Sequence, residues 1–211
     1  MRRIALALLL VLPCFGQVPM TKYVTITGNS IAQMQGGFQR NEFPLLPPAN
    51  VVVRGMYSYT CDHLLPLIAY IVPADTNVVV LYDSTNDVIR GVSVSSHMSC
   101  MEGTIAVLAA RNPAIRVIVV NTPPWTADNC YGDYRDAIDA YNAAYASEPW
   151  PSNVRVVDVW TPNVLQDGSR WADPNDMTGA CGIHPGPANQ WTDSWQHFTA
   201  PVSQSVMAVR R

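Results

Sequence analysis

Short apolar runs, bounded by polar or turn residues, recur along the chain. Five of them are rich in valine and isoleucine: Tyr23–Thr27, Val51–Arg54, Asn77–Tyr82, Arg116–Val120 and Val154–Val159. Runs that are apolar almost throughout, rather than alternating, are typical of strands buried on both faces, as in parallel sheets. The pattern therefore predicts five strands in one central sheet.

The segments between these runs have helical spacing. Helices are predicted over Leu64–Ile71, Met101–Arg111 and Tyr134–Ala146, and a closing helix over Gln190–Val209 that is broken near Pro201. Strands that alternate with helices indicate an α/β sandwich around a parallel sheet. The segment 160–190 has no periodicity, and a loop of that length in a compact domain is often functional. No repeat or linker divides the chain, so we expect a single domain.

Composition and charge exclude several classes of protein. The 211 residues are 48% hydrophobic and 14% charged, which is typical of a globular domain rather than a disordered chain. Thirteen basic and sixteen acidic residues give a net charge of −3 without any basic block, so nucleic acid is not an expected partner. The longest apolar run, Ile4–Leu12, is far shorter than the roughly 20 residues of a membrane span, so no transmembrane segment is expected.

The first sixteen residues have the layout of a secretory signal peptide. Arg2 and Arg3 precede the apolar run, and the small residues Cys14 and Gly16 follow it. We expect cleavage after Gly16, which leaves 17–211 as the mature domain in the periplasm or outside the cell. A buried N-terminal helix and a lipoprotein anchor at Cys14 are the weaker alternatives.

Export changes the interpretation of the cysteines. The mature chain keeps Cys61, Cys100, Cys130 and Cys181, and an even count in an oxidising compartment predicts two disulfides. Three pairings are compatible with the sequence. The four cysteines form no CxxC pair and no ligand spacing with histidine, so no metal site is expected.

Four chemically useful residues follow the predicted strands. Ser30 comes after the first strand, Gly55 after the second, Asn86 after the third and His184 after the fifth. Sites in parallel α/β sheets form at the carboxyl ends of the strands, so these residues are expected to converge. A serine becomes nucleophilic when a neighbouring base such as histidine takes its proton. The amides of Ser30 and Gly55 and the side chain of Asn86 then offer three donors to an oxyanion.

The order Gly-Asn-Ser-Ile (28–31), Gly55, Ser-Thr-Asn-Asp (84–87) and Gly-Ile-His-Pro (182–185) resembles the four blocks of the SGNH, or GDSL-type, serine hydrolases. The resemblance extends from Tyr23 to about Met207. It implies a three-layer α/β/α fold with a five-stranded, mostly parallel, flavodoxin-like sheet. It also implies ester hydrolysis with Ser30 as nucleophile, His184 as base and Ser30, Gly55 and Asn86 as oxyanion donors. No metal or organic cofactor is implied.

Three positions depart from the family pattern. Asn29 stands where the first block has aspartate, and Ser84 stands where the third block has glycine. Both changes are mild, since the aspartate is mainly architectural. The third is serious, because Cys181 occupies the position, three before the histidine, that holds the acid of the triad. Asp173, Asp176 or a backbone carbonyl is expected to orient His184 instead, and an inactive protein is the remaining alternative.

The placement of the cysteines relative to the strands favours one of the three pairings. Cys61 and Cys100 lie in the segments after the second and third strands, Cys130 follows the fourth, and Cys181 lies in the histidine loop. We predict Cys61–Cys100 and Cys130–Cys181, the second of which would hold the His184 loop to the body of the domain.

The sequence thus predicts a secreted esterase for short-chain carboxylic esters. Analogy with the family suggests O-acetyl groups on carbohydrate as the substrate. A lysophospholipase or thioesterase, and an idle glycan-binding protein, are the alternatives. The oligomeric state is not predicted.

Four aromatic residues in loops, Tyr57, Tyr59, Trp125 and Trp171, are more simply packing residues than a stacking platform. The histidines without a motif, His63, His97 and His197, are expected to be exposed or partly buried polar groups.

Overall fold

A single parallel sheet forms the centre of the molecule. The computed structural model describes residues 23–34, 51–174, 177, 180–184 and 193–209. The five strands are β1 (Tyr23–Gly28), β2 (Val51–Gly55), β3 (Thr76–Tyr82), β4 (Arg116–Val120) and β5 (Val154–Val157). They follow the order β2-β1-β3-β4-β5, and every neighbouring pair is parallel. This is the flavodoxin-like order, so the predicted strands and fold class are confirmed.

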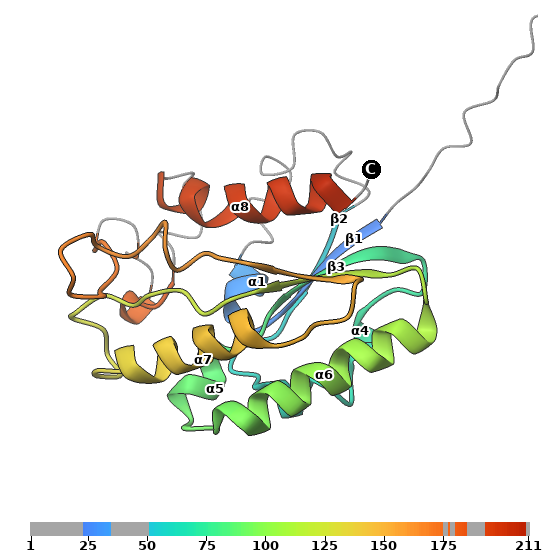
Figure 1. Cartoon of the computed structure of the whole chain (residues 1–211), viewed down its shortest axis with the longest axis horizontal. Coiled ribbons are helices and arrows are strands. Elements are labelled where there is room, and N and C mark those ends of the chain that lie inside the picture. Colours follow the sequence, from blue (N-terminus) through green and yellow to red (C-terminus); the bar gives the residue numbers. More distant parts are fainter. Residues whose placement is uncertain (1–22, 35–50, 175–176, 178–179, 185–192, 210–211) are drawn as a thin grey trace, which may run out of the picture.

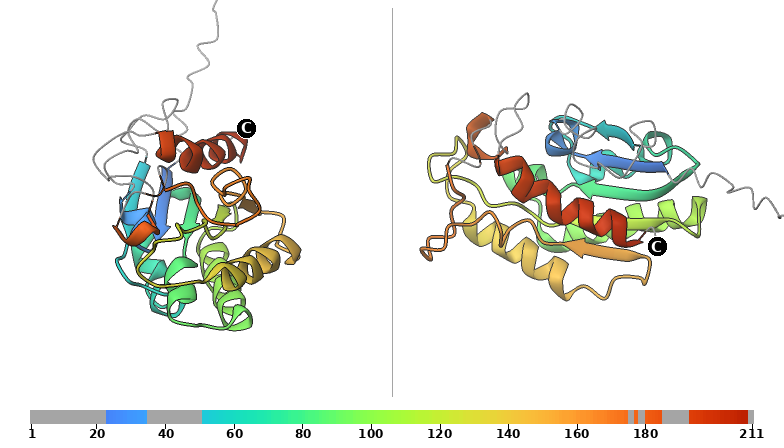
Figure 2. Two further views of the ribbon diagram at one scale, coloured as in Figure 1. Left: turned by 90° about the vertical axis from the view of Figure 1, so that its left-hand side faces the viewer. Right: turned by 90° about the horizontal axis from the view of Figure 1, so that it is seen from above.

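Helices cover both faces of the sheet (Figures 1 and 2). On one face lie α1 (Ser30–Met34) and α8 (Asp193–Val209). The opposite face carries α3 (Cys61–Leu64), α4 (Ile68–Ile71), α5 (Thr85–Ile89), α6 (Val94–Arg111) and α7 (Arg135–Ser147). Within the described part of the chain, no helix is long and apolar enough to cross a membrane. Residues 1–16 lie outside that part, so the signal peptide stays a prediction.

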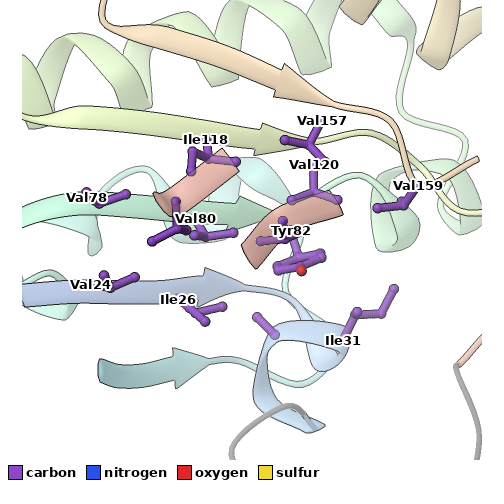
Figure 3. Close-up of a cluster of buried hydrophobic side chains, with 13 residues drawn as sticks. Val24, Ile26, Ile31, Val78, Val80, Tyr82, Ile118, Val120, Val157 and Val159 are labelled. Atoms are coloured by element: carbon purple, nitrogen blue, oxygen red, sulfur yellow. The ribbon is translucent and has the colours of Figure 1, made fainter. Parts of the chain in front are cut away.

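Side chains from alternate strand positions enter two separate cores. Val24, Val80 and Ile118 pack with α1 and α8 (Figure 3), whereas Val79 and Val117 pack with the helices of the other face. All five are at most 1% exposed, which is why their strands are apolar at successive positions.

Two predicted helices have clearly different bounds in the structure. The helix predicted over Leu64–Ile71 is two short helices, because Pro66 has no N–H to donate to the carbonyl of the preceding turn. The helix predicted from Met101 begins at Val94, where the Ser93 hydroxyl accepts a bond from the Ser96 N–H.

The predicted break at Pro201 is also wrong, since α8 continues through this residue to Val209. Pro201 costs the helix one backbone hydrogen bond. Val202 and Val206, on the following turns, are buried against the sheet and hold the helix in place.

Candidate active site

Ser30 lies at a tight turn from β1 into α1. The backbone N–H of Asn29 donates to the Tyr82 carbonyl on β3 at 2.7 Å, and the Asn29 side-chain oxygen accepts from the Ile31 N–H at 2.9 Å. Asn29 thus supplies an acceptor oxygen to the turn, as an aspartate at this position would. The turn leaves Ser30 as the first residue of α1, only 6% exposed and directly beyond the edge of the sheet.

His184 meets Ser30 across this edge. Its Nε2 atom lies 2.9 Å from the Ser30 Oγ atom, and the residue is 8% exposed. This is the separation of a direct hydrogen bond between a hydroxyl and an imidazole. The sequence prediction that these two residues come together is therefore confirmed. An imidazole at this distance is placed to accept the hydroxyl proton.

The loop that carries His184 is held by its neighbours on the β4–α7 segment. Cys181 forms the predicted disulfide with Cys130, and the Gly182 carbonyl accepts from the Thr126 N–H at 2.9 Å. Ile183 is 3% exposed and packs against Trp125. A disulfide, a backbone hydrogen bond and an apolar contact therefore fix the three residues that precede His184.

This loop needs two successive left-handed residues. Cys181 has φ of 60° and Gly182 has φ of 62°, a region that glycine adopts at little cost and other residues rarely enter. A Cβ atom at Gly182 would lie 1.9 Å from the Thr126 Oγ1 atom, so glycine is also required for space. The disulfide anchors Cys181 in this conformation.

The three predicted oxyanion donors lie at, or just beyond, the carboxyl ends of the neighbouring strands β2, β1 and β3. Gly55 ends β2 and pairs with Gly28 at the end of β1, while Asn86 lies on α5 just beyond β3. A Cβ atom on Gly55 would lie 2.1 Å from the backbone nitrogen of Gln33, so β2 ends directly against α1. Asn86 donates from Nδ2 to the Tyr59 carbonyl at 2.8 Å. An amide nitrogen carries two N–H groups, so a second donor remains.

The acid of the triad is not at its family position. Cys181 is engaged in a disulfide and has no titratable thiol. Asp173 is partly buried and accepts at its backbone carbonyl from Met177, and the preceding Ala172 N–H donates to the Trp125 carbonyl. Asp176 lies outside the described residues. The group that orients His184 stays a prediction.

Sequence reasoning missed a buried polar cluster that consists of Asp83, Asp87, His97 and Tyr145. His97 is 0% exposed, which overturns the expectation of an exposed or partly buried histidine. It lies on α6 at helical spacing from the buried Met101, Ile105 and Leu108, and this spacing is the signal that could have revealed its burial. Its ring nitrogens approach Asp87 and Tyr145.

Burial shifts the pKa values in this cluster. It raises the pKa of Asp83 well above the usual value, and the negative charge of Asp87 adds to the effect. It also raises the pKa of Tyr145 well above that of a free tyrosine. Both shifts favour the protonated form of the group, and the charge of Asp87 contributes to each of them.

The aromatic loop residues differ in burial: the two tryptophans are packed, whereas Tyr57 is exposed. Trp125 is 1% exposed in a core cluster, and Trp171 stacks under the Arg135 guanidinium at 4.2 Å. Tyr57, two residues after Gly55, is 59% exposed. Asp62 and His63 form polar contacts with Thr60 at the start of α3.

A flavodoxin-like sheet with a serine and a histidine hydrogen-bonded at its carboxyl edge is typical of α/β serine hydrolases. The sequence profile of the GDSL-like Lipase/Acylhydrolase family matches residues 26–191. The chain belongs to this family, which assigns it to the acylhydrolases and confirms the resemblance drawn from the four motifs. No curated protein sequence matches the chain.

Solved structures share the fold over most of the chain. A putative acylhydrolase from Bacteroides fragilis has a TM-score of 0.73 at 19% identity, covering 90% of this chain and 88% of its own. An acetyl esterase mutant with an acetate ion has a TM-score of 0.63 at 16% identity, with coverage of 89% and 97%. A carbohydrate esterase of family 3 from Talaromyces cellulolyticus has a TM-score of 0.60 at 17% identity, with the same coverage.

Proposed function

We propose that the protein is a secreted serine esterase that hydrolyses short-chain carboxylic esters through an acyl-Ser30 intermediate. The observation that carries this proposal is the 2.9 Å hydrogen bond between Ser30 Oγ and His184 Nε2 at the carboxyl edge of the sheet. Family membership supports ester hydrolysis in general, and the paired side chains supply a nucleophile and its base.

The reaction proceeds in two acyl-transfer steps. His184 accepts the Ser30 proton as Oγ attacks the ester carbonyl, and the tetrahedral oxyanion is bound by the amides of Ser30 and Gly55 and by Asn86 Nδ2. His184 then gives the proton to the departing alcohol oxygen, and the carbon–oxygen bond of the ester breaks. A water molecule, deprotonated by the same histidine, attacks the acyl-enzyme, and His184 returns that proton to the departing Ser30 Oγ as the acid is released.

A carboxylate or carbonyl outside the usual block orients the imidazole. Asp173, Asp176 and a backbone carbonyl are the three candidates, and the disulfide from Cys181 fixes the loop where the family acid would stand. An orienting acceptor on Nδ1 selects the tautomer with Nε2 free to take a proton. Asp173→Asn and Asp176→Asn, compared with the exposed Asp128→Asn, test the carboxylates. A loss of about 10⁴ in kcat is expected at the orienting residue, as for other triads.

The proposed substrate is an acetyl or similarly short ester, with O-acetylated carbohydrate as the natural class. Similar folds occur in proteins described as an acetyl esterase and as a carbohydrate esterase. The signal peptide predicted over 1–16, together with the two disulfides, supports a place outside the cytoplasm, where such polymers occur.

Hydrolysis of chromogenic acetate and octanoate esters tests the function. The 17–211 chain is expected to hydrolyse acetate faster than octanoate, and Ser30→Ala to abolish both activities. Ser152→Ala, an exposed serine elsewhere, is the matched control and is expected to keep full activity. A preference for octanoate would favour a lysophospholipase or thioesterase. Inactivity on both esters would favour the glycan-binding alternative, for which the cysteine at 181 is the supporting feature.

A further inference from the structure

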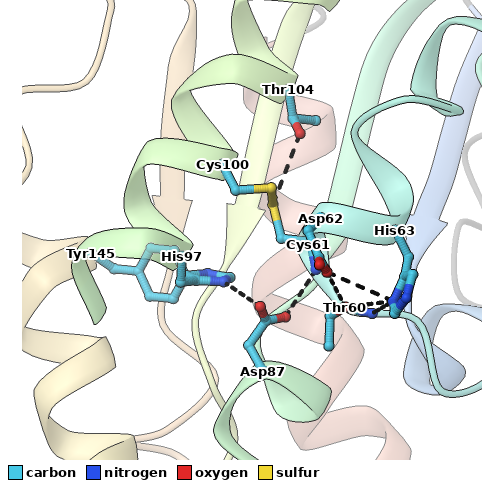
Figure 4. The surroundings of a disulfide bond; sticks show 9 residues. All are labelled: Thr60, Cys61, Asp62, His63, Asp87, His97, Cys100, Thr104 and Tyr145. Atoms are coloured by element: carbon cyan, nitrogen blue, oxygen red, sulfur yellow. Dashed lines mark hydrogen bonds and ion pairs between the residues drawn. A yellow bond between two sulfur atoms is a disulfide. The ribbon is translucent and has the colours of Figure 1, made fainter. Parts of the chain in front are cut away.

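Asp87 is a buried carboxylate directly beside the proposed oxyanion donor Asn86. It is 1% exposed, and Oδ2 accepts from the Cys61 N–H at 3.0 Å. On its other side Oδ1 lies 3.5 Å from His97 Nδ1, and His97 is 0% exposed (Figure 4). Taking a carboxylate out of water costs several kcal/mol unless such partners compensate. Asp87 is therefore hydrogen-bonded to Cys61 on α3 and lies within ion-pair distance of His97 on α6.

One of those elements is the segment that follows Gly55. Asn86 Nδ2 donates to the Tyr59 carbonyl at 2.8 Å, and Asp87 accepts from the Cys61 N–H. Arg90 Nη2 donates to the Ser58 carbonyl at 3.1 Å. Three side chains of α5 and its C-cap thus bind three backbone groups within residues 58–61. These bonds connect two proposed oxyanion donors, because Asn86 lies on α5 and residues 58–61 follow Gly55 closely in the chain.

The second element is α6, and a covalent bond joins it to the first. His97 Nε2 lies 2.5 Å from the Tyr145 hydroxyl on α7, and Cys100, one turn further along α6, forms the predicted disulfide with Cys61. The two partners of Asp87 are therefore tied to each other through Cys61–Cys100 (Figure 4). Asp87, Cys61, Cys100 and His97 thus form a closed ring of contacts, which includes the residue next to Asn86 in the sequence.

We propose that Asp87, bonded to the Cys61 N–H and paired with His97, is a positioning residue for the oxyanion site. It fixes α5 against residues 58–61 and thereby sets where the Asn86 amide points. The inference rests on the proposed function, because Asn86 matters only if an oxyanion forms there. Asp87 does not touch the substrate and acts through Asn86 alone.

A role in folding alone would produce a different pattern of losses. A residue that acts through Asn86 loses its effect once Asn86 is removed, whereas independent contributions multiply. An oxyanion donor acts in the transition state, so its displacement lowers kcat rather than raising KM. Both signatures can be measured on protein whose competent sites have been counted with a phosphonate that labels serine nucleophiles.

The experiment is a double-mutant cycle with Asp87→Asn and Asn86→Ala, assayed on an acetate ester. Asn86→Ala is expected to lower kcat per labelled site about 10²–10³-fold. Asp87→Asn is expected to lower it about 10–100-fold, since a misplacement of about 1 Å has effects of this size. KM should change less than about twofold, and the double variant should be no slower than Asn86→Ala within about threefold.

Two further variants make the result decisive. His97→Gln, for use if Asp87→Asn fails to fold, is expected to give a smaller loss of kcat that also disappears in the Asn86→Ala background. Asp83→Asn alters another buried carboxyl of the cluster and is expected to leave kcat unchanged. Losses that multiply, or an Asp83→Asn loss equal to that of Asp87→Asn, overturn the inference. Activity that survives Ser30→Ala overturns the proposed function instead.

Discussion

The Oγ atom of Ser30 and the Nε2 atom of His184 lie 2.9 Å apart although 154 positions separate them in the chain. Ser30 is placed by the turn that ends β1, and His184 by a loop fixed to the β4–α7 segment through Cys130–Cys181 and Thr126. The hydrogen bond therefore depends on contacts some distance from either side chain. Changes at those contacts should affect activity without altering the two residues themselves.

Removal of the Cys130–Cys181 disulfide is expected to lower both stability and turnover. The Cys130→Ser/Cys181→Ser variant should lose about 2–5 kcal/mol of unfolding free energy, as is typical for a native disulfide of an exported domain. Its kcat should fall because the His184 loop loses its covalent anchor. Urea unfolding and ester hydrolysis measure the two effects. Each single variant breaks the same bond and should match the double variant, and an unchanged kcat would show that the loop holds His184 without the bridge.

Gly55→Ala is expected to displace β2 from α1. The added Cβ would lie 2.1 Å from the Gln33 backbone nitrogen, so the backbone must shift at a cost of about 1–3 kcal/mol. The Gly55 amide would move with it, and kcat should fall. Gly103→Ala is the matched control, because its Cβ meets only the Leu65 side chain at 3.4 Å. Thermal unfolding and kcat measure the comparison, and equal behaviour of the two variants would contradict the packing argument.

Asp83 is expected to make the protein less stable as pH rises. Burial, reinforced by the charge of Asp87, raises the pKa of this carboxyl well above 3.8 in the folded state. Above that value the unfolded chain binds fewer protons than the folded one, so the free energy of unfolding falls toward the folded-state pKa. The fall is at most about 1.4 kcal/mol per pH unit.

Asp83→Asn removes this titration. Urea unfolding at several pH values between about 4 and 7 should give a shallower decline for the variant than for the unaltered protein. The exposed Asp128→Asn should follow the unaltered protein. Parallel curves for Asp83→Asn and the unaltered protein would show that Asp83 does not retain its proton.

The sheet could be predicted because its strands are buried on both faces. Val78–Leu81 are apolar at every position, and such runs are recognisable without knowledge of the partners. The placement of Ser30, Gly55 and Asn86 at the ends of neighbouring strands followed from the rule that the carboxyl ends of parallel strands share one edge. The two disulfides followed from the same placement of segments.

Other features depend on contacts that a sequence does not display. The first turns of α6, before Met101, contain several serines, which obscure the apolar spacing of a helix. The helix starts where Ser93 caps it. The burial of His97 becomes evident only when that longer helix is packed against Asp87 and Tyr145. Pro201 lies within α8 because buried neighbours outweigh its local effect. The proposed carboxylate candidates for orienting His184, Asp173 and Asp176, belong to a segment without periodicity, where spacing gives no register.

Covalent labelling with a small fluorophosphonate, followed by intact-mass and peptide analysis, tests the central claim most directly. The account predicts one adduct per chain on the peptide that contains Ser30, formed in step with the loss of acetate-ester hydrolysis. His184→Ala should slow the labelling by orders of magnitude, because the serine then lacks its base. Full loss of hydrolysis without an adduct on Ser30, or a label on another residue, would contradict the assignment of Ser30 as the nucleophile.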